Sequence, residues 1–179
     1  IDVTVGGPGL VAVGRDGGGF SWDNSTDQDA AVWTSVDGSS WSRIAHDEEV
    51  FGVGLPVMLS VTAEGPGLVA VGWSQPRMSN TPVWTSVDGV TWTRVAHEQG
   101  PATRGAMASI AAGGPGLVAV GARDGQGTAW TSADGATWSE VPTDPRSTTT
   151  VEWLSDVVAD GDRLVGFGFT IGTTSTEDE

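Results

Sequence analysis

Acidic side chains dominate the groups of this chain that could do chemistry. The 179 residues include 23 Asp and Glu but only 8 Lys and Arg, which gives a formal net charge of −15 at pH 7. That charge argues against nucleic acids and anionic membrane surfaces as partners, because both are negatively charged themselves. The chain has no Cys, which excludes disulfides, thiolate metal sites and Cys nucleophiles. It also has no Tyr, and no apolar run approaches the roughly 18 residues of a membrane-inserted span.

Histidine and aspartate provide two candidate metal sites. His46 and His97 occupy the same place in two sequence repeats, at the end of an expected strand, where the third repeat has Thr143. Two histidines on separate repeats make a poor zinc site, so we interpret both as ordinary strand-end residues. Four aspartates that could attract calcium lie in one long loop, Asp16, Asp23, Asp27 and Asp29. They lack the Asp-x-Asp-x-Asp-Gly spacing of a calcium loop, and we expect no metal and no cofactor.

Two recurring motifs define the elements that would position these side chains. The first, Gly-Pro-Gly-Leu-Val-Ala-Val-Gly, covers residues 7–14, 65–72 and 114–121, with a decayed copy at 161–168. The second, Trp-Thr-Ser-x-Asp-Gly-x-Ser/Thr-Trp, covers 33–41, 84–92 and 130–138. Units that recur at intervals of about 50 residues are typical of propeller blades. The sequence therefore predicts an all-β protein, a β-propeller of four-stranded antiparallel blades, with no helix longer than one turn.

Each unit divides into four expected strands. For the second unit these cover residues 58–63, 68–72, 83–86 and 91–95. The strand at 68–72 is apolar on both faces, which is typical of a strand buried between two neighbouring layers. We expect the small residues Ala70 and Gly72 to let neighbouring sheets approach each other. The Pro-Gly pairs that precede this strand, Pro8-Gly9, Pro66-Gly67 and Pro115-Gly116, predict type II turns.

The second motif predicts the turn of an outer hairpin in each unit. An Asp-Gly pair favours a tight turn, and Asp and Ser side chains accept hydrogen bonds from turn N–H groups. The motif resembles the Asp-box, or BNR repeat, of sialidase-like β-propellers, in a variant that is one residue shorter than the usual form. That resemblance covers nearly the whole chain and implies a structural role, away from the ligand face, for Ser35, Asp37, Gly38, Trp41, Ser86, Asp88, Gly89, Trp92, Ser132, Asp134, Gly135 and Trp138.

The chain accounts for three full blades and half of a fourth. Its units cover approximately residues 1–50, 51–100, 101–145 and an incomplete 146–179, which has strands over 153–158 and 164–168 only. Propellers have about 4 to 8 blades, so these residues cannot close a ring by themselves. We expect further blades of the same chain, or a second copy, to complete it, and we expect open apolar faces on the first and last units.

Ligand binding is predicted at the face where the loops differ from unit to unit. Variable loops on a constant scaffold are where recognition normally lies, and Trp and Arg are enriched at binding hot spots. The candidate residues in these loops are Arg15, Trp22, Trp73, Arg77 and Arg123. The hypothesis is a secreted, extracellular and bacterial β-propeller module, non-catalytic, that binds a glycan or a protein.

Two alternatives stay open. The chain could be a structural module whose blades assemble with others, or a piece of a sialidase-like glycoside hydrolase. The resemblance implies that such a hydrolase needs a Tyr nucleophile, which this chain lacks. We therefore expect no catalytic residue among these 179.

Overall fold

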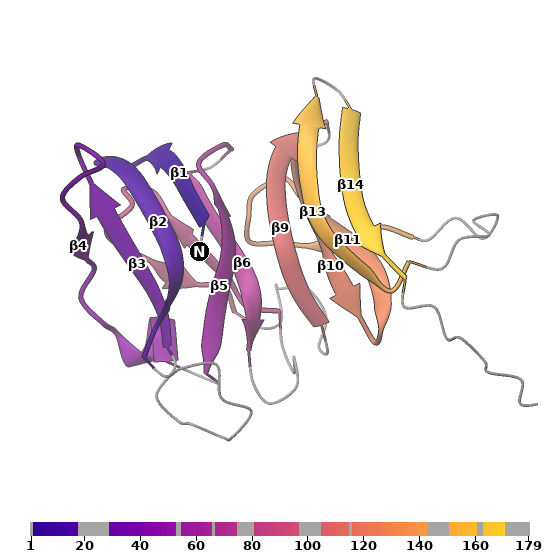
Figure 1. The fold of residues 1–179 in the computed structure, drawn as a ribbon, viewed down its shortest axis with the longest axis horizontal. Helices are drawn as coiled ribbons and strands as arrows, with labels where there is room; N and C mark the ends of the chain where they lie inside the picture. Colours follow the sequence, from indigo (N-terminus) through magenta and orange to yellow (C-terminus); the bar gives the residue numbers. More distant parts are fainter. Residues whose placement is uncertain are drawn as a thin grey trace, which may run out of the picture.

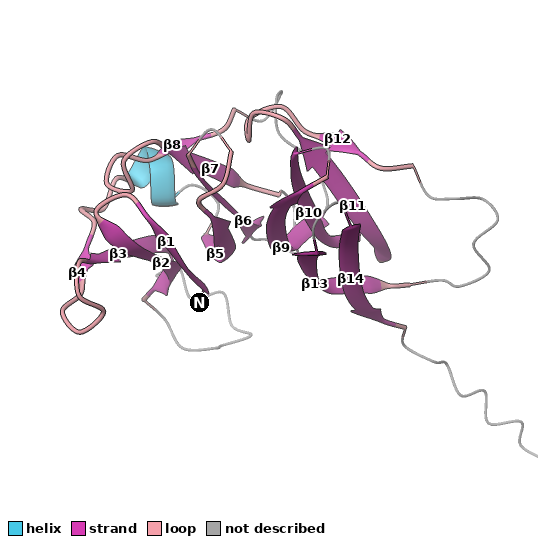
Figure 2. Ribbon diagram, turned by 90° about the horizontal axis from the view of Figure 1, so that it is seen from above, coloured by secondary structure: helices cyan, strands magenta, loops and turns pink. Residues whose placement is uncertain are grey.

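The computed structural model describes residues 2–17, 29–52, 55–65, 67–74, 81–96, 105–114, 116–142, 151–160 and 163–170. These residues form an all-β structure, as the repeats predicted, whose helical content is the single turn η1 (Glu48–Gly52). Figure 1 shows the sheets side by side in chain order, from β2 and β3 at one end to β13 and β14 at the other. The described part of the chain forms an open arc rather than a closed ring (Figure 2).

Three four-stranded antiparallel sheets are each made by strands that follow one another in the sequence. The first sheet holds β1 (Asp2–Gly6), β2 (Gly9–Asp16), β3 (Asp29–Ser35) and β4 (Ser42–Arg43). The second holds β5 (Pro56–Thr62), β6 (Leu68–Ser74), β7 (Val83–Ser86) and β8 (Thr93–Arg94). The third holds β9 (Gly105–Gly113), β10 (Gly116–Arg123), β11 (Gln126–Ser132) and β12 (Ser139–Glu140). A fourth, two-stranded sheet pairs β13 (Trp153–Asp160) with β14 (Arg163–Phe169).

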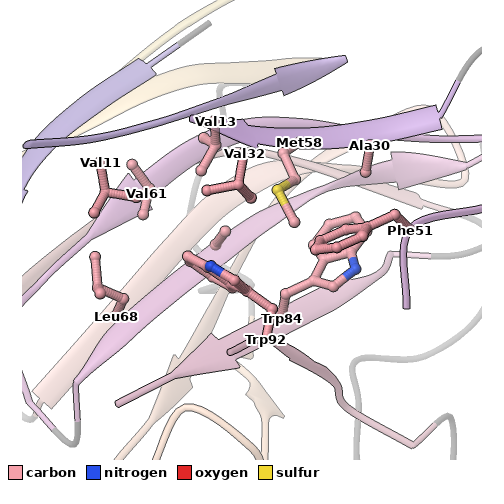
Figure 3. Close-up of a cluster of buried hydrophobic side chains, with 11 residues drawn as sticks. Val11, Val13, Ala30, Val32, Phe51, Met58, Val61, Leu68, Trp84 and Trp92 are labelled. Carbon is pink, nitrogen blue, oxygen red and sulfur yellow. The ribbon is translucent and has the colours of Figure 1, made fainter. Parts of the chain in front are cut away.

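The sheets pack face to face through the apolar strands β2, β6 and β10. Leu68 and Ala70 of β6 lie in a core shared with the first sheet, whereas Val69 and Val71 lie in a core shared with the third. Successive side chains of a strand point to opposite faces, so a strand covered on both faces must be apolar throughout. Figure 3 shows the first of these cores, in which Trp84 lies beside Phe51 and Met58.

Large apolar side chains are exposed on the outer faces of the first and last sheets. On the first sheet, Trp41 is 40% exposed, whereas its counterparts Trp92 and Trp138 are only 6% and 8% exposed because each lies in a core between two sheets. On the fourth sheet, Phe167 and Phe169 are about half exposed. Among the described residues, no sheet covers these two faces.

Three details of the predicted turns and strands are wrong. The hairpin between β1 and β2 pairs Gly6 with Gly9, so the turn is centred on Gly7 and Pro8 rather than on Pro8 and Gly9. Gly7 has φ +54°, which suits a type II′ turn with Gly at its first central position. The outer strand predicted over 91–95 is shorter, Thr93–Arg94, because the N–H of Thr91 donates to Asp88 within the turn.

The third correction concerns Gly72. The inner strand β5 has a bulge at Leu59, because Met58 pairs with Gly72 while Ser60 pairs with Val71. A Cβ on Gly72 would overlap the carbonyl oxygen of Val57 in that same sheet. Gly72 therefore allows β5 to bulge, rather than allowing neighbouring sheets to approach.

Candidate functional site

The three Ser-x-Asp-Gly turns have one geometry. In each turn the glycine N–H donates to the serine Oγ at 2.9 Å. The aspartate Oδ1 accepts two further turn N–H groups, from Val90 at 2.8 Å and Thr91 at 2.6 Å in the case of Asp88. The indole N–H of the following Trp donates to the carbonyl of the same glycine, which has φ near +75° in all three turns.

These hydrogen bonds stabilise the charged form of the aspartates. Hydrogen bonds from the N–H of Thr91, the largest contribution, and from the N–H of Val90 lower the pKa of Asp88 from 3.8 to about 2. The pKa of Asp134 is lowered to about 2 in the same way, chiefly by the N–H groups of Thr137 and Ala136, and that of Asp37 is lowered by Ser40 and Ser39. The carboxylates thus bind their own turns, which fits a structural role.

We expect stability to depend on pH through these turns. A depressed folded-state pKa contributes stability above the unfolded value near 3.8, and this contribution is lost as the pH falls toward about 2. Asp88→Asn keeps an acceptor oxygen without the charge, so it should reduce the loss of stability at low pH. Asp88→Ala should also lower the free energy of unfolding at pH 7. Urea denaturation of both variants from pH 7 to pH 2 is the measurement. An unchanged pH profile in both would contradict the assignment.

The opposite end of the sheets carries the residues predicted to bind ligands. Arg15, Trp73 and Arg123 were predicted in loops, but they lie within the ends of β2, β6 and β10 because the strand pairing extends to them. The structure therefore puts them on one rim but on three different sheets. All three are half-buried. Trp22 and Arg77 lie outside the described residues.

One pair of equivalent positions on this rim carries different side chains in each sheet. In the first sheet Asp16 accepts from Arg43 at 2.9 Å, and in the third sheet Arg123 donates to Glu140, with the two charges exchanged between the strands. In the second sheet the corresponding residues are Ser74 and Arg94, and the Arg94 guanidinium lies 5.8 Å from the centre of the Trp84 ring. The rim therefore varies in charge from sheet to sheet while the turns at the other end repeat.

A groove of about 370 Å³ opens beside Arg123. Its polar lining includes Gln126, Thr128 and Glu140, and its apolar lining includes Val141 and Leu154. The groove thus contains one of the residues predicted to bind ligands, Arg123.

A small cluster on the same rim was missed by the sequence analysis, which treated His46 as a strand-end residue. The Nε2 atom of His46 lies 3.1 Å from Glu48 Oε2 and 3.7 Å from Asp29 Oδ2. Donor atoms of all three residues lie within 4.8 Å of one another, so they could hold a divalent metal ion. The spacing His46-x-Glu48 was the signal available in the sequence. His97, Asp23 and Asp27 lie outside the described residues.

A second feature that the sequence analysis missed joins the inner strands. At one repeated position β1, β5, β9 and β13 carry Asp2, Ser60, Ser109 and Asp156. The Ser60 hydroxyl donates to Asp2 at 2.9 Å, and the Ser109 hydroxyl donates to Asp156 at 2.7 Å. The four residues line a polar hollow of about 340 Å³.

Each of these side chains also accepts a backbone N–H. The donors for Asp2, Ser60 and Ser109 belong to the next sheet and are Val61, Ile110 and Val157. Asp156 accepts instead from Val157 beside it. The serines are thus engaged in joining neighbouring sheets.

No family model matches this chain, and neither the curated proteins nor the solved structures include a significant match. The resemblance to Asp-box repeats therefore stays a prediction. Within the described residues, no helix has the length and apolar character needed to cross a membrane.

Proposed function

We propose that the chain is a non-catalytic β-propeller module that binds a glycan or a protein through the rim at the ends of β2, β6 and β10. The observation that carries this proposal is the contrast between the two ends of the sheets. The Ser-x-Asp-Gly turns have the same hydrogen bonds in all three sheets. On the opposite rim, the first sheet has the ion pair Asp16–Arg43, whereas the third sheet has Arg123–Glu140 with the charges reversed. A scaffold that stays constant while one rim varies is typical of a recognition surface.

The propeller interpretation is supported by the packing of successive sheets. Three four-stranded sheets and a two-stranded one stack in chain order around inner strands that contact one another. The number of blades and a location outside the cell are part of the proposal. An assembly module is a second candidate, which the exposed Trp41 and Phe167 favour.

Reversing the charges of one ion pair tests whether the rim binds the ligand. The double variant Arg123→Glu/Glu140→Arg copies the order of charges found in the first sheet, so it should fold with an unchanged melting temperature. We expect it, and Trp73→Ala, to weaken binding of a ligand selected from a glycan array or a phage-displayed peptide library by roughly tenfold or more. Val87→Ala, at the opposite end, is the matched control and should bind like the wild type.

Two results would contradict the proposal. One is a selected ligand that binds all three variants equally well, since the rim would then not be the binding surface. The other is a failure of both libraries to yield any saturable ligand for the folded protein.

A further inference from the structure

Trp84 occupies a defined place between the first two sheets. It is fully buried, and it shares a core with Ala30, Val32, Met58 and the partly buried Ile44. Figure 3 shows its ring between the two sheets, with Ala30 and Met58 nearby. Trp130 occupies the same place between the second and third sheets, in a core with Val83 and Val95.

The corresponding place between the third and fourth sheets is the groove beside Arg123. The counterparts of Ala30, Val32, Ile44 and Met58 in the repeat are Gly127, Ala129, Val141 and Leu154, and all four line this groove of about 370 Å³. Val32 and Val83 are almost fully buried, but Ala129 is half-buried and Val141 is 42% exposed. These positions are uncovered because no described residue lies where Trp84 and Trp130 lie in the other two interfaces.

The edge beside the groove is also unpaired. Among the described residues, β14 pairs with β13 alone. Its counterparts β2, β6 and β10 each pair on their other side with a further strand, β3, β7 and β11. Unpaired edge strands are templates for strand addition. The other sheets give the register, because Ala70 lies opposite Trp84 and Ala119 lies opposite Trp130.

We propose that the edge of β14 binds a β-hairpin of the type Val-Trp-Thr-Ser-x-Asp-Gly-x-Thr-Trp, with the first indole ring in the groove. In the inherited register the Trp lies opposite Gly166, the Thr opposite Val165 and the Val opposite Phe167. Gly166 has no side chain to obstruct the ring, and the indole covers Ala129 and Val141 as Trp84 covers Val32 and Ile44.

The occupant is a free hairpin rather than a second folded copy. The three hairpins of this kind in the chain are already paired within their own sheets, so a second copy could offer one only by giving up a sheet. The proposal depends on the repeated interface between sheets and not on ligand binding at the rim, so each can fail without the other.

A labelled peptide with the sequence of residues 81–95 tests the proposal by fluorescence anisotropy with the full chain. We expect saturable binding, and a peptide with Trp84→Ala should bind roughly tenfold more weakly or worse, because the groove is left unfilled. In the protein, Val141→Glu and Ala129→Trp should weaken binding of the unchanged peptide to a similar extent. Val87→Glu is the matched control, since it places the same charge at an exposed valine in the Ser-x-Asp-Gly turn of the second sheet, away from the groove.

Circular dichroism establishes that each variant is folded, and Ala129→Trp serves as the test if Val141→Glu fails to fold. Equal binding of the two peptides would overturn the proposal, as would a lack of binding to the folded wild type at millimolar peptide. Sedimentation of the protein alone gives a third result. A dimer that Val141→Glu abolishes would identify the occupant as a second copy and would also overturn it.

Discussion

We expect the replacement of Trp92 with alanine to lower the free energy of unfolding by about 3 to 5 kcal/mol, because it leaves a cavity between two sheets. Trp92 is 6% exposed and lies in the core that joins the first and second sheets. Its repeat counterpart Trp41 makes the same indole hydrogen bond to a glycine carbonyl but is 40% exposed. We expect Trp41→Ala to cost less than about 1 kcal/mol, as for other surface substitutions.

Urea denaturation of both variants at pH 7 measures this difference. The pair is matched, because the two tryptophans differ in whether a preceding sheet covers them and not in their own turns. Equal losses would show that the tryptophan stabilises its turn rather than the interface. A large loss for Trp41→Ala alone would show that the face of the first sheet is covered in solution.

The strands and the cores were predictable because the information for them is local. The repeated motif predicted the extent of β7, Val83–Ser86, and the lack of polar residues at 68–72 predicted the two-sided burial of β6. The Ser and Asp side chains of the second motif act within four residues, so the sequence was sufficient to assign their turn hydrogen bonds. The resemblance to a family added the expectation that these turns are structural, which their geometry supports.

The features that were missed depend on contacts between distant residues. Ser109 meets Asp156 across two sheets, at a separation of 47 residues, and neither residue belongs to a recognisable motif. His46 approaches Asp29 because β4 is paired with β3, so this cluster requires the register of that hairpin. Arg15, Trp73 and Arg123 were predicted in loops but lie within the ends of β2, β6 and β10. The sequence also could not show that Arg123 is paired with Glu140.

The second large loss of stability is expected for a substitution at Gly72. Gly72→Ala should lower the free energy of unfolding by about 3 kcal/mol or more, because the new methyl group cannot be placed without moving backbone. Its Cβ would overlap the carbonyl oxygen of Val57, a backbone atom of the strand that bulges at Leu59. The bulge precedes Ser60, so the substitution should also disturb the hydrogen bond from Ser60 to Asp2.

Gly166→Ala is the matched control for that substitution. Gly166 also lies in an apolar strand, but the nearest atoms to its Cβ position, from Asp156 and Leu154, are 3.9 Å away. Its repeat counterparts are already alanine, among them Ala70 and Ala119, so the change should alter stability by less than about 0.5 kcal/mol. Urea denaturation of the two variants is the measurement. If Gly72→Ala were as stable as Gly166→Ala, the close contact between position 72 and the Val57 carbonyl, and with it the role of Gly72 in the bulge, would be contradicted.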